Sequence, residues 1–453
     1  MSVTAGEPTT ADAADITEAK AGDPTPDDAI ALGVDAHLGG VDIERLAADV
    51  GTPFYAYDLD VIERTVARLR AVLPARFELA YAVKANPALA VVAHLGSLGL
   101  GADVASRGEL ALVDRAGIEP ARVVFTGPGK RDEELAAAVD AGLRAVTVES
   151  PGELGRLEAI AVSRGRRTPV LLRIAAGVGS PAERVRIVGD AGVGKFGMDA
   201  GSLRAAARLA ARSPHLDLLG LHAFGASNVL DAPSLAAHAA ATMSAARAMA
   251  VATGIPLRLI DMGGGLGIAY ERGPAPLDLA AFGAALRALD LLWSADPVTR
   301  STRVIVEPGR YLVARAGAFV ARVVDRKCAD GLTVAIIDGG IHHLLRPALV
   351  GQDHRIVSFG PPRGGARPER VTIAGPLCSG LDVFARGTWM VAPEVGDLVA
   401  VLDVGAYGFT ESMPLFLSHP IPAEVAIRGG RAALIRPRVE PSAWLEPQRL
   451  PAW

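Results

Sequence analysis

Cysteines and long apolar runs are nearly missing from this 453-residue sequence. It contains two cysteines, Cys328 and Cys378, and no run of 18 apolar residues. Two cysteines cannot form a disulfide framework or a cysteine-based zinc site, so we predict no bound metal. The lack of a long apolar run excludes a transmembrane helix. With 46 basic and 50 acidic residues, the chain also lacks the excess of positive charge that nucleic-acid binding requires. We expect a soluble cytoplasmic protein.

Lysine is rare, since only five of the 46 basic residues are lysines. Arginine serves wherever positive charge alone is needed, so a lysine inside an apolar run is a candidate for amine chemistry. Lys84 lies in such a run, YAVKAN. A desolvated amine there could form a Schiff base with an aldehyde. The alternative is a lysine at the rim of the fold that extends into solvent.

Acidic residues are concentrated at the N-terminus. Residues 1–28 carry a net charge of −6, which leaves +2 for the remaining chain. This segment has no aromatic residue, one valine and one isoleucine. It cannot bury enough apolar area to offset the entropy of ordering, so we expect a disordered acidic tail.

Eight β-rich runs alternate with alanine-rich helical patterns within residues 53–313. Apolar residues spaced three and four apart, as in residues 202–211 and 235–253, predict the helices. Eight such units are typical of a (β/α)8 TIM barrel, so we expect an α/β protein. The predicted strands are residues 77–83, 101–104, 122–126, 145–149, 170–174, 218–224, 257–262 and 303–307.

The pattern changes at residue 314. Short runs rich in valine and isoleucine, separated by glycine or proline, predict a mainly β domain over residues 314–437, of sandwich or barrel type. We expect residues 29–52 to join this domain by adding a strand, and residues 438–453 to form a C-terminal tail. The predicted strands of this domain include residues 317–324, 333–337, 370–373, 398–401 and 423–427.

The carboxyl ends of barrel strands are where active groups gather. A glycine run, Gly263 to Gly265, follows the seventh predicted strand and could present N–H groups to a phosphate. The eighth strand ends in Glu307 and, after two residues, Arg310. These could pair with a cationic cofactor nitrogen and a phosphate, or simply form a surface ion pair. Together with Lys84 they match the requirements of pyridoxal 5'-phosphate.

From about residue 32 to residue 436 the chain resembles the fold-type III pyridoxal-phosphate decarboxylases, the family of diaminopimelate and ornithine decarboxylases. The matching motifs, in family order, are YAVKAN, GADVASRGEL, KFGM, DMGGGLG, EPGRY, DGG, GPLCSGLD and GAYG. The resemblance implies an amino-acid decarboxylase, a carboxy-lyase. It also implies a barrel that binds pyridoxal phosphate and a homodimer with shared active sites completed by the β domain.

Individual roles follow from the same resemblance. Lys84 is expected to attach the cofactor, Glu307 to pair with its pyridine nitrogen, and Cys378 of the other subunit to return a proton to the α-carbon. A buried structural cysteine is the alternative for Cys378, and a packed structural histidine is the alternative for His222. The other expected cofactor ligands are Asp103, Arg173, His222, Phe224, Ser227, Gly263, Gly264, Gly265, Gly309, Arg310 and Tyr407. The expected substrate contacts are Arg310, Arg346, Ser379, Asp382 and Tyr407.

Departures from the family pattern bear on the substrate. Ser379 stands where members acting on diamines carry a carboxylate, and a hydroxyl cannot offset the desolvation of a buried ammonium equally well. Phe224 replaces the ring-stacking histidine of the diaminopimelate enzymes, and Val350 replaces a tyrosine. Arg346 matches their reader of a distal carboxylate. Residues 416–420 resemble a natural-product branch that includes the butirosin-type glutamyl decarboxylase.

These features favour a decarboxylase for an amino acid without a free distal amine, presented by an acyl carrier protein. An altered diaminopimelate decarboxylase that forms L-lysine is one alternative. An amino-acid racemase shares the barrel and the lysine, but it would place arginine near the pyridine nitrogen, where this chain has Glu307. A non-catalytic regulatory homologue is a further alternative, against which Lys84, Glu307 and Cys378 all count.

Overall fold

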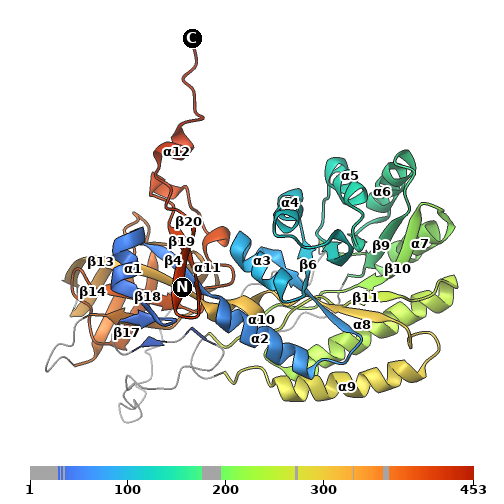
Figure 1. The fold of residues 1–453 in the computed structure, drawn as a ribbon, viewed down its shortest axis with the longest axis horizontal. Coiled ribbons are helices and arrows are strands. Elements are labelled where there is room, and N and C mark those ends of the chain that lie inside the picture. Colours follow the sequence, from blue (N-terminus) through green and yellow to red (C-terminus); the bar gives the residue numbers. More distant parts are fainter. Residues whose placement is uncertain are drawn as a thin grey trace, which may run out of the picture.

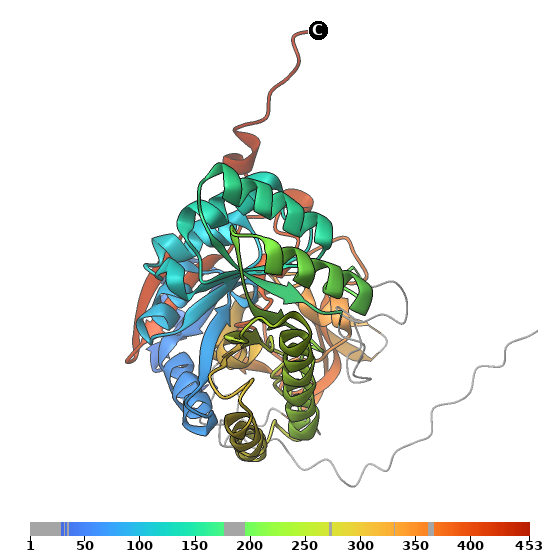
Figure 2. The same cartoon turned by 90° about the vertical axis from the view of Figure 1, so that its right-hand side faces the viewer.

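A closed barrel of parallel strands forms one half of the molecule. The computed structural model describes residues 29–30, 32–33, 36–175, 195–270, 274–329, 331–360 and 367–453. Within them, eight strands close in the order β10-β11-β12-β5-β6-β7-β8-β9, and Figure 2 looks toward this end of the molecule. This confirms the predicted TIM barrel. The strands are β5 (Phe77–Ala82), β6 (Gly101–Val104), β7 (Val123–Phe125), β8 (Ala145–Val148), β9 (Thr168–Arg173), β10 (Leu216–His222), β11 (Leu259–Asp261) and β12 (Arg303–Val306).

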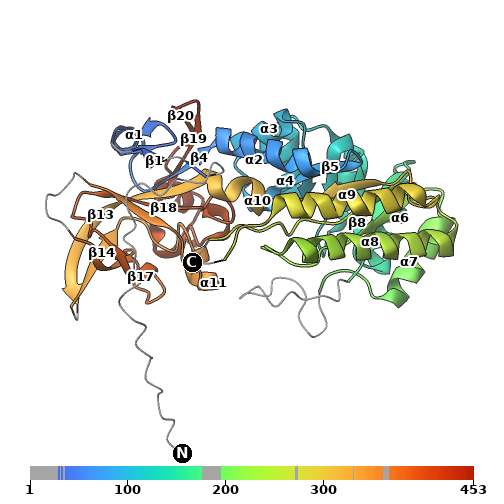
Figure 3. The ribbon, with the colours of Figure 1, turned by 90° about the horizontal axis from the view of Figure 1, so that it is seen from below.

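Helices surround the barrel strands. Several begin at an Asp or Ser whose side chain accepts a backbone N–H of the first turn, such as Ser106, Ser150 and Asp231. These N-caps satisfy donors that would otherwise lack partners and fix where each helix leaves its loop. The helices are α2 (Leu59–Val72), α3 (Leu89–Ser97), α4 (Arg107–Arg115), α5 (Asp132–Ala141), α6 (Pro151–Ser163), α7 (Ala200–Arg212), α8 (Ala232–Thr253) and α9 (Leu279–Ala295). Figure 3 shows α8 and α9 along one side.

Small and branched side chains fill the barrel interior. Ala80, Val124, Ala145, Leu171 and Ile305 belong to one buried cluster contributed by different strands. The barrel is therefore a packed core, and the functional groups must gather at its rim.

The mainly β domain lies at the opposite end of the elongated molecule (Figure 1). It contains one branched sheet, which runs β17-β16-β14-β13-β4-β19-β20 with β18 and β15 attached beside β13. The long strand β13 joins the two parts, since its first half pairs with β4 and β18 and its second half with β14. The strands are β4 (Phe54–Asp58), β13 (Gly317–Ala329), β14 (Leu332–Ile337), β15 (Ile356–Phe359), β16 (Glu369–Ala374), β17 (Val383–Met390), β18 (Leu398–Leu402), β19 (Ala423–Arg428) and β20 (Arg431–Arg436).

The N-terminal strand of this sheet differs from our prediction. It is β4, at residues 54–58, which we had assigned to the barrel, and it pairs parallel to β19 and antiparallel to β13. Residues 29–52 instead contain the small sheet β1 (Leu32–Gly33), β2 (His37–Leu38) and β3 (Val41–Asp42), followed by α1 (Ile43–Val50). Ile30, Leu38 and Ile43 pack in one cluster with side chains of β4, β13, β18 and β19.

The structure describes the C-terminal end of the chain but not the first 28 residues. The predicted acidic tail, residues 1–28, lies outside the described residues. The C-terminal residues include the short helix α12 (Ser442–Leu445) and extend away from the body, with Trp453 fully exposed (Figure 1). No helix in the described part of the chain has the length and apolarity needed to cross a membrane.

Candidate active site

Lys84 lies at the carboxyl end of the first barrel strand. It follows β5 in the short 3-10 helix η1 (Val83–Ala85), and its Nζ is 3.2 Å from Oδ2 of Asp103 at the end of β6. Asp103 is buried and also accepts a hydrogen bond from Thr126, whereas the Lys84 side chain is 44% exposed. The amine is therefore held on one side and accessible on the other.

The pKa of Lys84 reflects two opposing effects. Burial of its surroundings disfavours the ammonium, but the carboxylates of Asp103 and Glu307 outweigh that effect and raise the pKa. Without a ligand beside it, Lys84 is therefore a cation at neutral pH.

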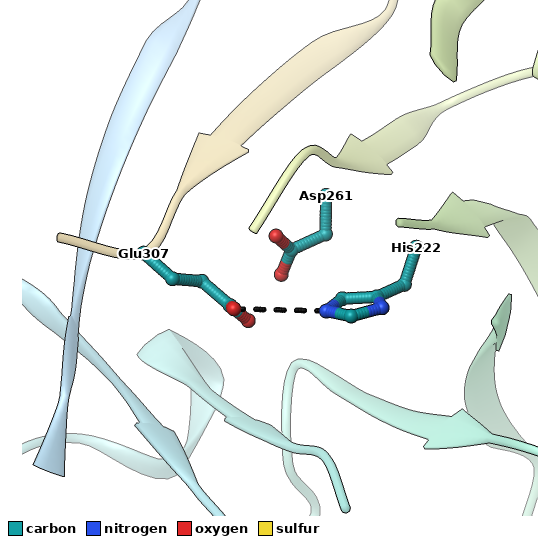
Figure 4. A group of neighbouring side chains, drawn as sticks. All are labelled: His222, Asp261 and Glu307. Atoms are coloured by element: carbon teal, nitrogen blue, oxygen red, sulfur yellow. Dashed lines mark ion pairs between the residues drawn. The ribbon is translucent and has the colours of Figure 1, made fainter. Parts of the chain in front are cut away.

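A buried cluster of Glu307, Asp261 and His222 faces the same end of the barrel from three neighbouring strands (Figure 4). Each residue offers one ligand atom, and these atoms lie within 4.8 Å of one another. His222 Nε2 is 3.6 Å from Glu307 Oε2, and Glu307 Oε1 has no hydrogen-bond partner. An unsatisfied buried carboxylate oxygen is costly, so the cluster is suited to a cationic group, whether a metal ion or a protonated ring nitrogen.

The two carboxyl groups of this cluster differ in their affinity for protons. Burial and the neighbouring Glu307 raise the pKa of Asp261 well above its usual value. Burial alone would also raise the pKa of Glu307, but pairing with His222, the charge of Lys84 and a hydrogen bond from Asp261 lower it to about 2. Asp261 is thus the protonated member of the pair, and Glu307 is the ionised one.

The glycine run after β11 has a conformation that side chains would disrupt. Gly263 has φ +65°, and a Cβ there would lie 2.8 Å from the Ala223 carbonyl and from the Phe224 ring. At Gly264 a Cβ would lie 2.2 Å from the carbonyl oxygen of Glu307. Asp261 fixes the turn by accepting the Gly263 N–H at 2.9 Å. Glycine at these positions therefore lets the backbone lie close to both flanking strands.

Arg310 connects the barrel rim to the β domain. It follows Gly309 at the start of α10 (Arg310–Val313) and is 4% exposed. Its guanidinium donates to Tyr270 Oη at 2.9 Å and to Ser227 Oγ at 3.1 Å. It also lies over the Tyr407 ring, 4.7 Å from the centroid, and the Tyr407 N–H donates to the Ala85 carbonyl beside Lys84. Arg310, Ser227 and Tyr407 therefore lie together, and their binding of phosphate stays a prediction.

Arg346 lies beside the same two rings, Tyr270 and Tyr407. It is the first residue of α11 (Arg346–Val350) and is 4% exposed. Its guanidinium is 5.5 Å from the Tyr407 ring centroid and 3.5 Å from Oε2 of Glu411. The predicted reader of a substrate carboxylate therefore already contacts a carboxylate of its own chain.

Arg173 and Phe224 occupy the rim without contacting Lys84 in any described interaction. Arg173, at the end of β9, is buried and forms a 2.6 Å ion pair with Glu149. Phe224 is half-buried just after β10 and packs on the glycine run. Both remain candidates for lining the cofactor pocket.

Cys378, Ser379 and Asp382 lie together in the β16–β17 loop. Cys378 is exposed, and among the described residues no hydrogen bond or ion pair joins the loop to Lys84 or Glu307. Asp382 is buried, and its carboxylate accepts the N–H groups of Ile341 and Leu377, both at 2.7 Å. The Asp382 carboxylate thus holds this loop, because buried N–H groups require acceptors, and its contact with substrate stays a prediction.

Three neighbouring residues were not predicted from the sequence. Asp261 opens the DMGGGLG motif, and a carboxylate at a strand end was the available signal. Glu411 follows GAYG by three residues but belongs to no pattern. Tyr270 is buried between the two guanidiniums, and a lone tyrosine in a loop gives no signal.

The residues present fit pyridoxal phosphate. The phosphate requires backbone donors and a cation, which the glycine run and Arg310 provide. The pyridine nitrogen requires an anionic partner, which the unsatisfied Oε1 of Glu307 provides. The aldehyde requires an accessible amine, which the partly exposed Lys84 provides at this rim.

Comparisons with known proteins agree with this geometry. A family model described as the pyridoxal binding domain of pyridoxal-dependent decarboxylases matches residues 59–314. Diaminopimelate decarboxylase of Zymomonas mobilis is 33% identical over 88% of this chain and 93% of its own length. An L-glutamyl-(BtrI acyl-carrier protein) decarboxylase of Niallia circulans is 33% identical over 88% of this chain and 94% of its own.

A solved structure leads to the same conclusion. Diaminopimelate decarboxylase from M. jannaschi has a TM-score of 0.86 and 28% identity, over 94% of this chain and 99% of that chain. The family model alone covers more than half of the chain, and the curated relatives align with nearly all of it. The chain belongs to the fold-type III pyridoxal-dependent decarboxylases and is a carboxy-lyase that uses pyridoxal phosphate.

Proposed function

We propose that this enzyme removes the α-carboxylate of an amino acid that has no free distal amine and that is presented by an acyl carrier protein. The observation that carries the proposal is that the nearby carboxylates already have partners within the chain. Among the described residues near Tyr407 and Cys378, Asp382 already accepts two backbone N–H groups and Glu411 contacts Arg346. Both carboxylates already have partners within this chain, and position 379 offers only a hydroxyl to a substrate ammonium.

Different residues of the barrel rim have different roles in cofactor binding and catalysis. Lys84 would hold the cofactor aldehyde through its amine, where the substrate amine must also reach. The glycine run, Ser227 and Arg310 hold the phosphate. Pyridoxal phosphate, when bound, supplies the electron sink for the negative charge left on the α-carbon as CO₂ departs. Glu307 stays ionised because of its neighbours and keeps the ring nitrogen protonated, which strengthens that sink.

Cys378 supplies the proton that returns to the α-carbon. For that purpose it must be a thiol and not a thiolate. Because Cys378 is exposed and no described hydrogen bond or ion pair joins its loop to Lys84 of the same chain, we propose that it serves the site of a second copy in a homodimer. Leu381, 62% exposed in the same loop, is suited to such an interface.

The carrier-protein part of the proposal has two supports. The Niallia circulans relative bears the name of an enzyme for a carrier-bound glutamyl group. The chain beyond residue 28 has a net charge of +2 and uses arginine for most of its positive charge, which would favour an acidic partner.

The test is mass spectrometry of substrates incubated with the purified enzyme and pyridoxal phosphate. One arm uses amino acids bound to an acyl carrier protein, and the other uses the same free amino acids together with diaminopimelate. We expect loss of CO₂ from a carrier-bound glutamyl group. Rapid formation of lysine from free diaminopimelate would overturn the proposal.

A second candidate is diaminopimelate decarboxylase, favoured by the names of the Zymomonas mobilis relative and of the M. jannaschi structure. It requires a site for the distal ammonium, and the two carboxylates named above already have partners within the chain. The lysine assay separates the two candidates directly.

A further inference from the structure

We infer that Glu411 is a specificity-determining residue, which occupies the guanidinium of Arg346 and so excludes substrates with a free distal carboxylate. The inference rests on the proposed function, because it assumes that the distal end of the substrate extends toward Arg346. It assigns a role to a residue that belongs to none of the motifs in the sequence.

The two charged groups form a partly buried pair. Arg346 Nη1 lies 3.5 Å from Glu411 Oε2, with side-chain exposures of 5% and 27%. The Arg346 Nε atom is buried and has no hydrogen-bond partner, so the guanidinium retains the capacity to bind one more acceptor. A buried cation of this kind attracts any nearby anion, and Glu411 is the anion supplied by the chain.

Local hydrogen bonds hold Glu411 in this position. It ends the short 3-10 helix η4 (Phe409–Glu411), and Ser412 follows it. The Ser412 hydroxyl accepts the N–H of Leu345, next to Arg346, at 3.0 Å, and donates to the Gly408 carbonyl at 2.8 Å. The segment that carries Glu411 is therefore tied to the start of α11, and the pair is a built feature of the site.

The pair lies beside the cofactor site. The Tyr407 ring is 4.7 Å from the Arg310 guanidinium carbon and 5.5 Å from that of Arg346. The Tyr407 backbone N–H donates to Ala85, the residue after Lys84. A substrate attached near Lys84 would thus find Arg346 one aromatic ring away from the phosphate-binding arginine.

This arrangement discriminates by charge. A free distal carboxylate that reached Arg346 would also meet the Glu411 carboxylate, and like charges in a partly buried site repel strongly. An amide or thioester at the same position carries no charge and meets no such repulsion. Specificity of this kind depends on the unfavourable group as much as on the favourable one.

The test measures binding of two probes that have no amino group, glutarate and its monoamide, to the enzyme loaded with pyridoxal phosphate. Calorimetry gives the two dissociation constants and their ratio. We expect Glu411→Gln to shift the ratio toward glutarate by at least about tenfold. Ser412→Ala, which removes the hydroxyl that holds the segment, should shift it in the same direction by a smaller factor.

Two controls make the result specific. Glu446→Gln removes the same charge from an exposed site in the C-terminal residues and should leave the ratio as it is in the wild type. Adding Arg346→Gln to Glu411→Gln should abolish the gain, because the guanidinium that binds the freed carboxylate is lost. An unchanged ratio in Glu411→Gln, or a gain that persists without Arg346, would overturn the inference.

This measurement also separates the inference from the proposed function. Loss of CO₂ from free but not from carrier-bound amino acids, without lysine formation and with a shifted probe ratio in Glu411→Gln, would overturn the carrier-bound substrate and support the role of Glu411. Lysine formation from diaminopimelate by the wild type would overturn both, because diaminopimelate has a free distal carboxylate. An unchanged ratio without lysine formation would overturn the role of Glu411 alone.

Discussion

The imidazole Nε2 of His222 lies 3.6 Å from the Glu307 carboxylate, and both side chains are at least 96% buried. Asp261 completes the group and carries the proton that two adjacent buried carboxyl groups share unequally. Glu307 is thereby kept ionised in a place where burial alone would favour its neutral form. We expect His222 and Asp261 to act as positioning residues, which set the charge of Glu307.

Replacing Glu307 by glutamine should separate cofactor binding from catalysis. The amide keeps the shape but cannot stabilise a protonated ring nitrogen, so we expect pyridoxal phosphate to bind while kcat falls by about 10²–10³. Stopped CO₂-release assays measure kcat, and the absorption spectrum reports cofactor loading. Glu424→Gln, which alters a buried ion-paired glutamate of the β domain, is the matched control. Equal activity of Glu307→Gln and wild type would contradict the assignment.

Loss of the Lys84 amine should abolish the absorption band of lysine-attached cofactor and leave the fold intact. The side chain is 44% exposed and makes its ion pair at the rim, so truncation leaves no cavity in the barrel core. Absorption spectra of Lys84→Ala and of Lys327→Ala, an exposed lysine on β13, provide the comparison. A normal band in Lys84→Ala would show that another amine attaches the cofactor.

The barrel was predictable because its signals are local. Each strand is a short apolar run followed by a helix, and the chemistry stands directly after the strands, as with Lys84 and Glu307. Strand β4 was not predictable in the same way. All five of its residues are buried, and its partners, β13 and β19, lie more than 250 residues away in sequence.

The site shows the same division between local and long-range information. The GPLCSGLD motif predicts Asp382 as a substrate contact, but it does not report that Asp382 also accepts the N–H of Ile341, 41 residues away. The Arg346–Glu411 contact spans 65 residues and has no motif. Such contacts depend on which loops the β domain brings together. The periodicity of apolar residues in the sequence carries no information about contacts between distant loops.

An added methyl group in the glycine run should weaken cofactor binding. Gly263→Ala places a Cβ 2.8 Å from the Ala223 carbonyl and strains a residue with φ +65°. Gly254→Ala is a matched control, because Gly254 has φ +71° but nothing within 4 Å of its Cβ. We expect both to lose about 1 kcal/mol or more in free energy of unfolding from backbone strain. Only Gly263→Ala should also raise the dissociation constant of pyridoxal phosphate, measured by fluorescence titration.

Stability should fall as pH decreases from about 6.5 toward 4. Burial lowers the pKa of His354 from 6.5 to about 4, although its hydrogen bond to the Leu402 carbonyl partly opposes this. In the unfolded chain His354 is protonated near pH 6.5, whereas in the folded protein it stays neutral down to about pH 4. Acid therefore favours the unfolded state. Between pH 7 and pH 5 this difference in pKa should lower the free energy of unfolding by about 2 kcal/mol. His354→Asn, which keeps a donor for Leu402, should reduce the loss seen in denaturation curves, whereas His215→Asn at a more exposed site should not.

Mixing two inactive variants should restore activity if Cys378 serves the site of a second subunit. Lys84→Ala and Cys378→Ala each disable both sites of their own homodimer. In a mixed dimer one site has both defects and the other has neither, so random exchange of subunits should restore about a quarter of wild-type activity. The rate of CO₂ release after dissociation and remixing measures this, and each variant remixed with itself is the control. No recovery despite mixed dimers detected by native mass spectrometry would mean that Cys378 acts within its own chain or not at all.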